Sequence, residues 1–259
     1  MTATVQQFRG SAARGVSAGA SVAEVRLTSK PPRISVVVPL YRSAETVREL
    51  YERLCRVLEQ SGEAFEIILV DDACPAGSGA VAREIVVVDS RVRLLTLSRN
   101  QGQHRAVLAG LEHVRGEWCV VMDADLQDPP EAIAQLLAER TPETGAVFAG
   151  RRGRYESRGR LLTSRLFKTA LHALCGVPRD AGMFVMLERN LVQRLLAMTG
   201  PEPFVVAMIG CSGFPCRSIP VPRAVRPRGT SAYSSLMRLR SACRGLAWAF
   251  RWRLHAMNR

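Results

Sequence analysis

Near its middle the chain reads Val120-Val-Met-Asp-Ala-Asp-Leu-Gln-Asp-Pro-Pro-Glu131. A short apolar run here ends in two aspartates spaced one residue apart, and such a run with polar residues after it is typical of a buried β-strand. The same arrangement occurs upstream, where the run Ile67-Ile-Leu-Val70 ends in Asp71 and Asp72. Two apolar strands that both end in carboxylates predict a sheet with one acidic edge.

The segments around these runs alternate between strand and helix patterns. Apolar runs predict further strands at 34–38, 92–97 and 118–122, and apolar residues at helical spacing predict helices at 45–60 and 102–113. We interpret residues 85–88 as the end of a helix, since a strand there would leave too short a connection to Val92. This alternation predicts an α/β fold whose mostly parallel sheet is flanked by helices.

The sequence becomes less regular after residue 150. We expect helices at 161–174, 189–198 and 235–257, a strand at 183–187 and an Arg-, Pro- and Gly-rich loop at 222–231. The apolar face of the last helix is predicted to consist of Leu236, Leu239, Cys243, Leu246, Phe250, Leu254 and Met257. Residues 1–30 have no sustained apolar period and are predicted to be a disordered leader.

The charge of the chain is unevenly distributed. Its 36 basic and 23 acidic residues give a net charge of +13, and the hydrophobic fraction of 47% excludes a disordered or collagen-like chain. Acidic residues outnumber basic ones in 34–150, whereas 151–259 is strongly basic and its basic residues are nearly all arginines. This asymmetry predicts that the two parts bind different ligands.

Cysteine usage and hydropathy bear on the compartment. Seven cysteines without a Cys-x-x-Cys pair predict reduced thiols in a cytosolic protein and argue against a zinc site. No apolar run of signal-peptide length precedes Pro31, and nowhere do about 18 uncharged apolar residues follow one another. We expect a cytoplasmic protein whose basic part allows peripheral attachment to an anionic membrane surface at its inner face.

The acidic residues at the strand ends predict a metal site. In an open parallel sheet the carboxyl ends of the strands border one ligand site, where four carboxylates repel each other unless a cation or polar groups are present. Oxygen ligands at the spacing of Asp123 and Asp125 suit Mg²⁺ or Mn²⁺ together with phosphate oxygens, which predicts a metal with a diphosphate. Acidic residues also serve as helix N-caps, and we assign that role to Asp128.

A family resemblance rests on four stretches in order: Val36-Val-Val-Pro-Leu-Tyr41, Leu69-Val-Asp-Asp72, Leu97-Ser-Arg-Asn-Gln-Gly102 and the stretch 120–131. Together they resemble the glycosyltransferase family 2 enzymes with the GT-A fold, in particular the polyprenyl-phosphate sugar transferase branch that includes dolichol-phosphate mannosyltransferase. The resemblance extends from Ile34 to Ala249. It implies a Rossmann-like GT-A domain in which residues 31–150 bind the nucleotide sugar and residues 151–259 bind the acceptor.

The resemblance also implies roles for single residues. Pro39, Tyr41, Asp71, Asp72 and Asp123 match positions around the nucleotide, while Asp123, Asp125 and Gln127 match the positions that hold Mg²⁺ or Mn²⁺, Asp125 being placed as catalytic. Basic residues that match phosphate- and acceptor-binding positions are Arg151, Arg152, Arg154, Arg223 and Arg226, with Gly229, Ser231 and Tyr233 in the same loop as the last two. The stretch Asp180-Ala-Gly-Met-Phe184 resembles an acceptor-side Asp-x-Gly-Asp-Phe motif.

Several positions depart from the family pattern. Met183 replaces an acid, Val185 an arginine and Ala232 a lysine, and Arg42-Ser43 stands where the family usually has Asn-Glu. These changes affect the identity of the acceptor and of the donor base and leave the metal motif intact.

The implied reaction is an inverting, metal-dependent transfer of a hexosyl or N-acetylhexosaminyl group from a UDP- or GDP-sugar to polyprenyl phosphate. A phosphate acceptor is already a nucleophile at neutral pH, whereas a hydroxyl acceptor needs a general base, for which Asp180 is the candidate, although it could equally cap the next strand. Many relatives carry transmembrane helices beyond this point, so a peripheral enzyme or one with a soluble small-molecule acceptor is expected. The last helix, with Trp248 and Trp252, either lies in a membrane interface or packs on the sheet.

Two other classes of function compete with this interpretation. The segment Gly77-Ser-Gly-Ala-Val-Ala82 imitates a dinucleotide-binding Gly-x-Gly-x-x-Ala, but it does not directly follow its strand. The basic second half suggests nucleic-acid binding, but it contains no recognisable nucleic-acid-binding motif and few aromatic residues among its arginines. We therefore expect no nucleic-acid partner.

Overall fold

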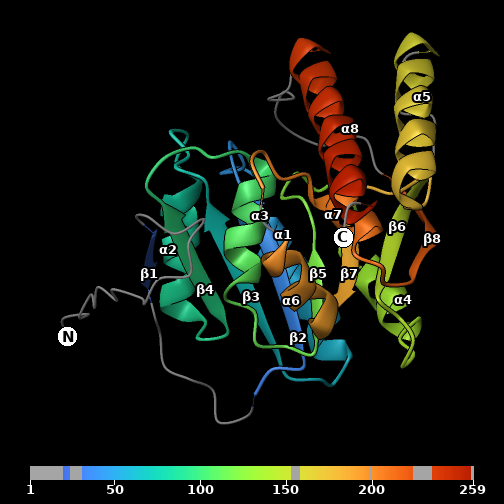
Figure 1. Ribbon diagram of the computed structural model, residues 1–259. Coiled ribbons are helices and arrows are strands. Elements are labelled where there is room, and N and C mark those ends of the chain that lie inside the picture. The colour runs from blue at the N-terminus through green and yellow to red at the C-terminus, as the bar shows by residue number, and fades with distance from the viewer. Residues whose placement is uncertain (1–19, 24–30, 153–157, 199, 224–234, 258–259) are drawn as a thin grey trace.

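The computed structural model describes residues 20–23, 31–152, 158–198, 200–223 and 235–257. Within these ranges one eight-stranded sheet forms the centre of the molecule, in the order β1-β4-β3-β2-β5-β7-β6-β8 (Figure 1). Its strands are β1 (Ala20–Ala23), β2 (Ile34–Leu40), β3 (Phe65–Asp71), β4 (Val92–Leu97), β5 (Trp118–Val121), β6 (Ala146–Arg152), β7 (Val185–Glu188) and β8 (Cys216–Pro222). Only β1 and β7 run against the others, so the predicted mostly parallel sheet is confirmed.

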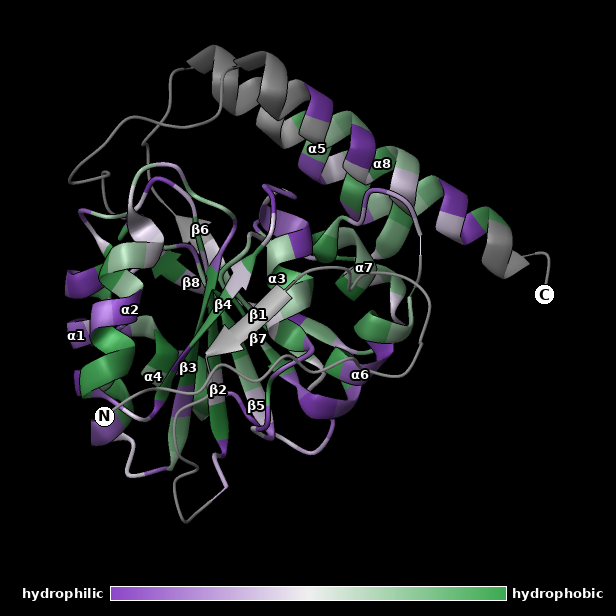
Figure 2. Ribbon diagram, turned by 90° about the vertical axis from the view of Figure 1, so that its left-hand side faces the viewer, coloured by the Kyte–Doolittle hydropathy of each residue, from purple (hydrophilic) through white to green (hydrophobic). Residues whose placement is uncertain are grey.

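Helices cover both faces of the sheet. One face carries α1 (Val47–Gln60), α2 (Ser78–Val88) and α4 (Ala132–Ala138), and the other carries α3 (Gln103–Leu111), α6 (Arg189–Ala197) and α7 (Val205–Cys211), as Figure 2 shows. Alternate residues of the strands feed the two cores: Val36 and Val38 pack toward α1, whereas Val37 packs toward α3. Burial on both faces explains why the strands are almost continuously apolar in sequence.

Helices α5 (Arg158–Cys175) and α8 (Ser235–Met257) pack on each other and project beyond the end of the sheet at which the parallel strands finish (Figures 1 and 2). The predicted apolar face of α8 is wrong from Cys243 onward: Cys243 is exposed, and of the predicted residues whose burial the structure describes only Leu246 packs against the core. Trp248 and Ala249 are the buried residues there, and Trp252 stacks on Trp248 at 5.4 Å, whereas Phe250 is 55% and Leu254 47% exposed.

The reason for the different face lies in the neighbour that α8 contacts. A Cβ atom on Gly245 would lie 3.0 Å from the ring of Phe204, so α8 approaches α7 through its small residues and buries the two tryptophans beside them. The last helix was expected either to lie in a membrane interface or to pack on the sheet. In the structure Trp248 and Trp252 pack against the protein core. None of the described helices combines the length and apolar character that a membrane crossing requires.

The structure corrects other expectations about the elements. Residues 20–23 of the predicted disordered leader form β1, which pairs antiparallel with β4, while the rest of the leader lies outside the described residues. Helix α7 was not predicted, because its seven residues are too few to reveal a helical period. The assignment of 85–88 to a helix end is confirmed by α2, and all seven cysteines are free thiols.

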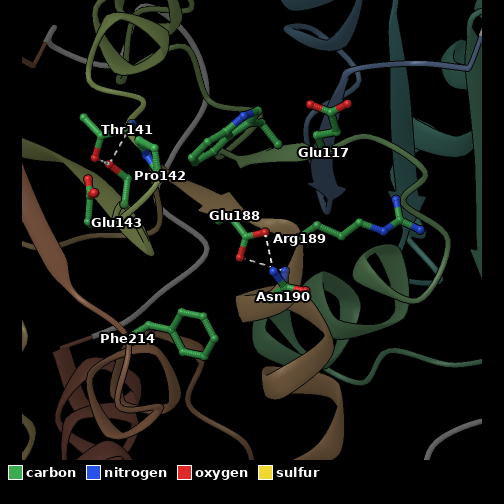
Figure 3. A pocket seen from close by; sticks show the side chains of 10 residues that line it. Glu117, Thr141, Pro142, Glu143, Glu188, Arg189, Asn190 and Phe214 are labelled. Atoms are coloured by element: carbon green, nitrogen blue, oxygen red, sulfur yellow. Dashed lines mark hydrogen bonds between the residues drawn. The ribbon is translucent and has the colours of Figure 1, made fainter.

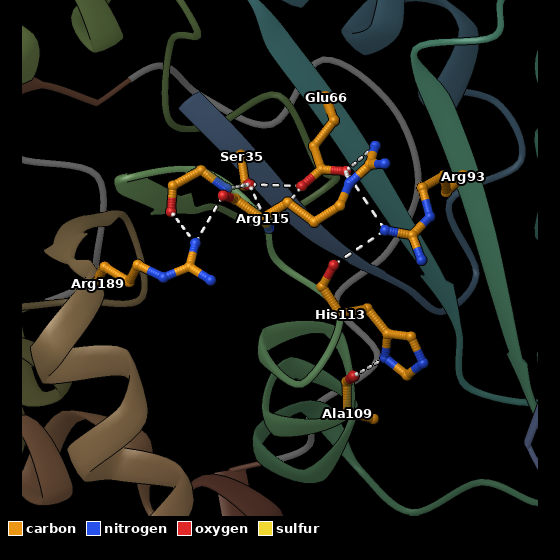
Figure 4. Close-up of polar contacts among 8 residues, drawn as sticks. Ser35, Glu66, Arg93, Ala109, His113, Arg115 and Arg189 are labelled. Atoms are coloured by element: carbon orange, nitrogen blue, oxygen red, sulfur yellow. Dashed lines mark hydrogen bonds and ion pairs between the residues drawn. The ribbon is translucent and has the colours of Figure 1, made fainter. Parts of the chain in front are cut away.

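The amino ends of the parallel strands are joined by the buried carboxylate of Glu66, which is 1% exposed (Figure 4). It accepts hydrogen bonds from Ser35 Oγ at 2.7 Å and from the backbone N–H and Nε of Arg115, both at 2.8 Å. Arg93 forms a second ion pair with it at 3.3 Å. Strands β2, β3 and β4 and the residues before β5 are therefore fixed at the edge opposite the acidic strand ends.

Candidate active site

The carboxyl ends of β2, β3 and β5 bring the predicted nucleotide-binding residues to one edge of the sheet. Leu40 is in register with Asp71, and the N–H of Asp72 donates to the carbonyl of Leu40 at 3.2 Å. On the other side of β2, the N–H of Met122 donates to the carbonyl of Val37 at 3.2 Å. Pro39, Tyr41 and the two pairs of aspartates are thus neighbours although they lie far apart in sequence.

Asp71 is held by the turn that follows it. One carboxylate oxygen accepts from the N–H of Cys74 at 3.0 Å, and the other lies 2.1 Å from where a Cβ atom on Gly79 would be. Gly79 therefore makes room for the aspartate. The close approach to Asp71 explains why Gly79, one glycine of the apparent dinucleotide motif, is needed here. Six residues separate the end of β3 from the start of α2 at Ser78, whereas a dinucleotide-binding motif follows its strand directly.

Asp72 faces into the protein and orders the loop after β4. Its two carboxylate oxygens accept from the N–H groups of Gln101 at 2.6 Å and Gly102 at 2.9 Å, and the residue is 3% exposed. Gly102 has φ +87° and ψ 157°, a conformation that glycine adopts without strain. Burial raises the pKa of Asp72, partly offset by these two backbone hydrogen bonds. The structure therefore gives Asp72 a direct role in loop geometry, beside its predicted place near the nucleotide.

Gln103, the first residue of α3, is a site residue that the sequence did not identify. Its amide Nε2 donates a short hydrogen bond to Oδ1 of Asp123. The available signal was its position directly after Leu97-Ser-Arg-Asn-Gln-Gly102. Through this contact the loop that Asp72 organises also supports the first aspartate of the Asp-x-Asp pair.

The segment after β5 turns sharply so that both aspartates remain partly exposed. Leu126 has φ +57°, which is strained for a side chain of this kind, and it is 3% exposed. The N–H of Gln127 donates to Oδ1 of Asp125 at 3.1 Å. A second residue missed by sequence, the buried Thr46, donates to the carbonyl of Ala124 at 2.6 Å and fixes the turn from the side of α1.

The chemistry of these donors fits a hard divalent cation. Asp123 and Asp125 are partly exposed, and Gln127, also partly exposed, adds an amide oxygen close by. Among the described residues no group of three or more His, Cys, Asp or Glu side chains surrounds a single point. Two carboxylates and one amide oxygen are the kind of donors with which proteins hold Mg²⁺ while its other positions are taken by water and phosphate.

Asp128 does not cap a helix, contrary to the prediction. Helix α4 starts at Ala132 with Glu131 as its N-cap, because the two prolines after Asp128 form a separate turn first. The buried carboxylate of Asp128 instead lies 3.2 Å from Nε of Arg223. Arg223 follows β8 and was predicted to bind phosphate or acceptor, and the structure places it against the acidic turn of the site.

Asp180, the candidate base, lies between α5 and β7 in the sequence and is partly exposed. Its carboxylate lies beside Gly150, near the end of β6. Arg151 and Arg152 continue β6, which places their backbone at the same edge of the sheet as the aspartates. The remaining predicted positions, Arg154, Arg226, Gly229, Ser231, Ala232 and Tyr233, lie outside the described residues.

His104, next to Gln103, completes the polar surroundings of α3. Its ring lies 4.4 Å from that of Phe204, and its Nδ1 accepts from the N–H of Val205 at 3.4 Å. Desolvation lowers the pKa of His104 to about 4, so the ring is neutral at physiological pH. It serves as an acceptor that joins α3 to α7.

A pocket at the opposite edge of the sheet is separate from this site (Figure 3). It is lined by residues that begin β5, precede β6 and β8, and follow β7. Its polar groups are used structurally: Glu188 caps α6 by accepting from the N–H of Asn190 at 2.8 Å, and Arg189 donates to the carbonyl of Arg115. None of the residues predicted for the site lines this pocket.

Comparison with known proteins agrees with this architecture. Solved structures with the same GT-A fold include a mannosyltransferase from Pyrobaculum calidifontis in complex with GDP-Man and Mn²⁺, with a TM-score of 0.61 and 20% identity over 86% of this chain and 65% of that one. Another is glucosyl-3-phosphoglycerate synthase from Mycobacterium tuberculosis with Mn²⁺, UDP-Glc and phosphoglyceric acid, with a TM-score of 0.61 and 17% identity over 84% of this chain and 80% of that one.

Curated relatives are more similar in sequence. The undecaprenyl-phosphate 4-deoxy-4-formamido-L-arabinose transferase of Pseudomonas fluorescens is 34% identical over 78% of this chain, and an uncharacterized glycosyltransferase of Bacillus subtilis, YkcC, is 31% identical over 79%. The chain spans 61% and 64% of the length of these two relatives, respectively. The family model described as glycosyl transferase family 2 matches residues 35–196, which is more than half of the chain, and this protein therefore belongs to that family.

Proposed function

We propose that this glycosyltransferase moves a sugar from a nucleotide diphosphate sugar to polyprenyl phosphate, with inversion at the anomeric carbon and with Mg²⁺ or Mn²⁺. The observation that carries the proposal is the edge of β2, β3 and β5, where Asp71 and the Asp123–Asp125 pair lie at the ends of the two strands that flank β2, and where Asp71 and Asp125 each accept a hydrogen bond from a backbone N–H of their own turn. Mn²⁺ with GDP-Man or UDP-Glc is bound by the two structural neighbours named above.

On the donor side, Asp123 and Asp125 would hold the metal with the amide oxygen of Gln127. When bound, the metal supplies positive charge that stabilises the leaving diphosphate. Thr46 and Gln103 keep the two aspartates in place from opposite sides, and Asp72 keeps the loop that carries Gln103 in its conformation. Ligands that are fixed in this way would let the bound metal stabilise the developing charge without reorganising during the reaction.

On the acceptor side, polyprenyl phosphate is favoured by the curated relatives that are named for transfer to undecaprenyl phosphate and by the basic second half of the chain. The departures from the family at Met183 and Val185 do not argue against it, because both side chains are buried in the hydrophobic core, at 7% and 0% exposure. Asp180 is partly exposed and is our candidate to accept a proton from the acceptor, either from the monoprotonated form of the lipid phosphate, whose second pKa is about 6, or from the hydroxyl of a small-molecule acceptor.

The test measures nucleotide release by the full chain from a panel of UDP- and GDP-sugars with Mn²⁺, in the presence and absence of a short polyprenyl phosphate. We expect one donor to be turned over faster when the lipid phosphate is present. Asp125→Asn should lower that rate about 100-fold or more, because a ligand to the charge-stabilising metal is lost. The matched control, Glu143→Gln, removes an exposed carboxylate at the opposite edge of the sheet and should leave the rate unchanged.

Two outcomes would contradict parts of the proposal. Equal nucleotide release with polyprenyl phosphate and without it, combined with stimulation by a soluble sugar or nucleoside, would replace the lipid acceptor with a small-molecule hydroxyl. Full activity of Asp125→Asn, or activity that persists in excess chelator, would remove the metal from the reaction.

A further inference from the structure

Two oxygens from distant segments converge on one glycine of β6. A Cβ atom on Gly150 would lie 2.1 Å from Oδ2 of Asp180 and 2.4 Å from Oγ of Ser218. Real Cβ atoms do not tolerate such distances, so both oxygens can occupy their positions only because residue 150 has no side chain. The carboxylate and the hydroxyl are therefore close neighbours on the same side of this strand.

The hydroxyl of Ser218 is unusual in its surroundings. Its Oγ is buried and has no hydrogen-bond partner among the residues that the structure describes. Buried polar groups are nearly always paired, so an unpaired hydroxyl beside a carboxylate indicates an interaction that forms in another state of the site. Ser218 is well fixed for this, because it lies within β8 and is in register with Phe148 of β6.

We propose that Ser218 is a positioning residue for Asp180. By rotation about its side chain, the hydroxyl donates a hydrogen bond to Oδ2 of Asp180 and holds the carboxylate in the orientation that the acceptor requires. The Oγ atom is itself buried, whereas Asp180 is partly exposed, so Ser218 acts through the carboxylate and not on the acceptor. Gly150 provides the space that the two groups share.

This inference rests on the proposed function, in which Asp180 faces the acceptor. When Oδ2 of Asp180 accepts a hydrogen bond from Ser218, the second carboxylate oxygen stays directed toward the acceptor. Hydrogen bonds to a charged group are roughly twice as strong as those between neutral groups. The consequence is specific: Ser218 should influence turnover of the acceptor and not binding of the nucleotide sugar, whose predicted residues lie on β2, β3 and β5.

The test uses a matched pair of variants of the full chain. Ser218→Thr keeps the hydroxyl, and Ser218→Val has the same shape with a methyl group in its place. We expect Ser218→Val to lower kcat for transfer to polyprenyl phosphate about tenfold relative to Ser218→Thr, as for a lost hydrogen bond to a charged group, with the KM for the donor unchanged. In an Asp180→Asn background the difference between the two variants should disappear, because contacting residues that act together are not additive.

Equal rates for Ser218→Thr and Ser218→Val, or the same tenfold difference in the Asp180→Asn background, would overturn the proposal. A second measurement does not depend on the reaction: crystal structures of the two variants. A carboxylate of Asp180 that is hydrogen bonded to residue 218 in Ser218→Thr and turned away in Ser218→Val would support it, and one unchanged orientation in both would contradict it, even if the acceptor proves to be something other than a lipid phosphate.

Discussion

At the scale of single residues, Asp72 shows how a side chain near a ligand site can serve the backbone. Both of its carboxylate oxygens accept from N–H groups of the loop at 101–102. We expect Asp72→Ala to lower the free energy of unfolding by about 2 kcal/mol, since two partly buried N–H groups lose their acceptors, and Asp72→Asn to cost less because one oxygen remains. Urea unfolding of both variants checks this, alongside calorimetric titration with UDP and GDP in Mn²⁺. Weaker nucleotide binding without any change in stability would show instead that Asp72 acts as a ligand contact.

His104 gives a second prediction at this scale, concerning pH. Its pKa falls from the ordinary 6.5 to about 4 in the folded chain because the ring is desolvated. A folded-state pKa below the unfolded one means that the stabilising contribution is complete above pH 6.5 and is lost as the pH falls toward 4. We expect a loss of about 2–3 kcal/mol over that window, because each unit of difference between the folded and unfolded pKa corresponds to about 1.4 kcal/mol.

The comparison variant is His104→Asn, whose amide oxygen can accept from Val205 in place of Nδ1 but does not titrate. The difference in the free energy of unfolding between the two proteins, measured in urea from pH 7 to pH 4, should change in the direction that favours the variant. A difference that stays constant across this range would contradict the assigned shift.

At the scale of secondary-structure elements, the carboxylate of Glu66 links four segments of the sheet at the edge opposite the site (Figure 4). Glu66→Gln should lower the free energy of unfolding by about 2–3 kcal/mol, because two arginines lose a buried partner. The control is Glu117→Gln, which breaks the exposed ion pair with Arg33 at 2.9 Å and should cost clearly less than Glu66→Gln, because water screens exposed charges. Equal effects of the two substitutions in urea unfolding would mean that the Glu66 network is not a stabilising link.

At the scale of the whole molecule, α5 and α8 project from the end of the sheet that carries the site and expose apolar and basic side chains. Phe250 and Leu254 are exposed on α8, and Leu166 is 65% exposed on α5. We expect the protein to sediment with vesicles that contain anionic phospholipid, more weakly as salt is raised, because exposed arginines contribute roughly 1 kcal/mol each near such a surface. Phe250→Glu combined with Leu254→Glu should weaken this binding about tenfold or more.

A matched control for vesicle binding is available on α2. Val87 and Val88 are 83% and 76% exposed, so Val87→Glu with Val88→Glu introduces the same charges on another apolar surface. Loss of binding in this control would argue against α8 as the attachment surface. Equal binding to neutral and anionic vesicles would contradict the contribution of the exposed arginines.

The sequence by itself determined the pattern of strands and helices and the acidic strand ends. Apolar runs such as 92–97 predict strands that are buried on both faces, and the helical period of α1 predicts one buried side. The alternation of strands and helices can therefore be predicted from short stretches of sequence. The pairs Asp71–Asp72 and Asp123–Asp125 were predicted to meet for the same reason, because parallel strands end at one edge.

Only the tertiary structure decided which partner each side chain has. Sequence spacing does not reveal that Asp72 is occupied by backbone N–H groups, that Asp128 pairs with Arg223, or that α8 buries Trp248 and exposes Phe250. Each of these contacts joins segments separated by tens of residues, and the free energy of such a contact depends on burial and geometry that exist only after the chain has folded. Local periodicity therefore specifies the elements, whereas the packing between them specifies the site.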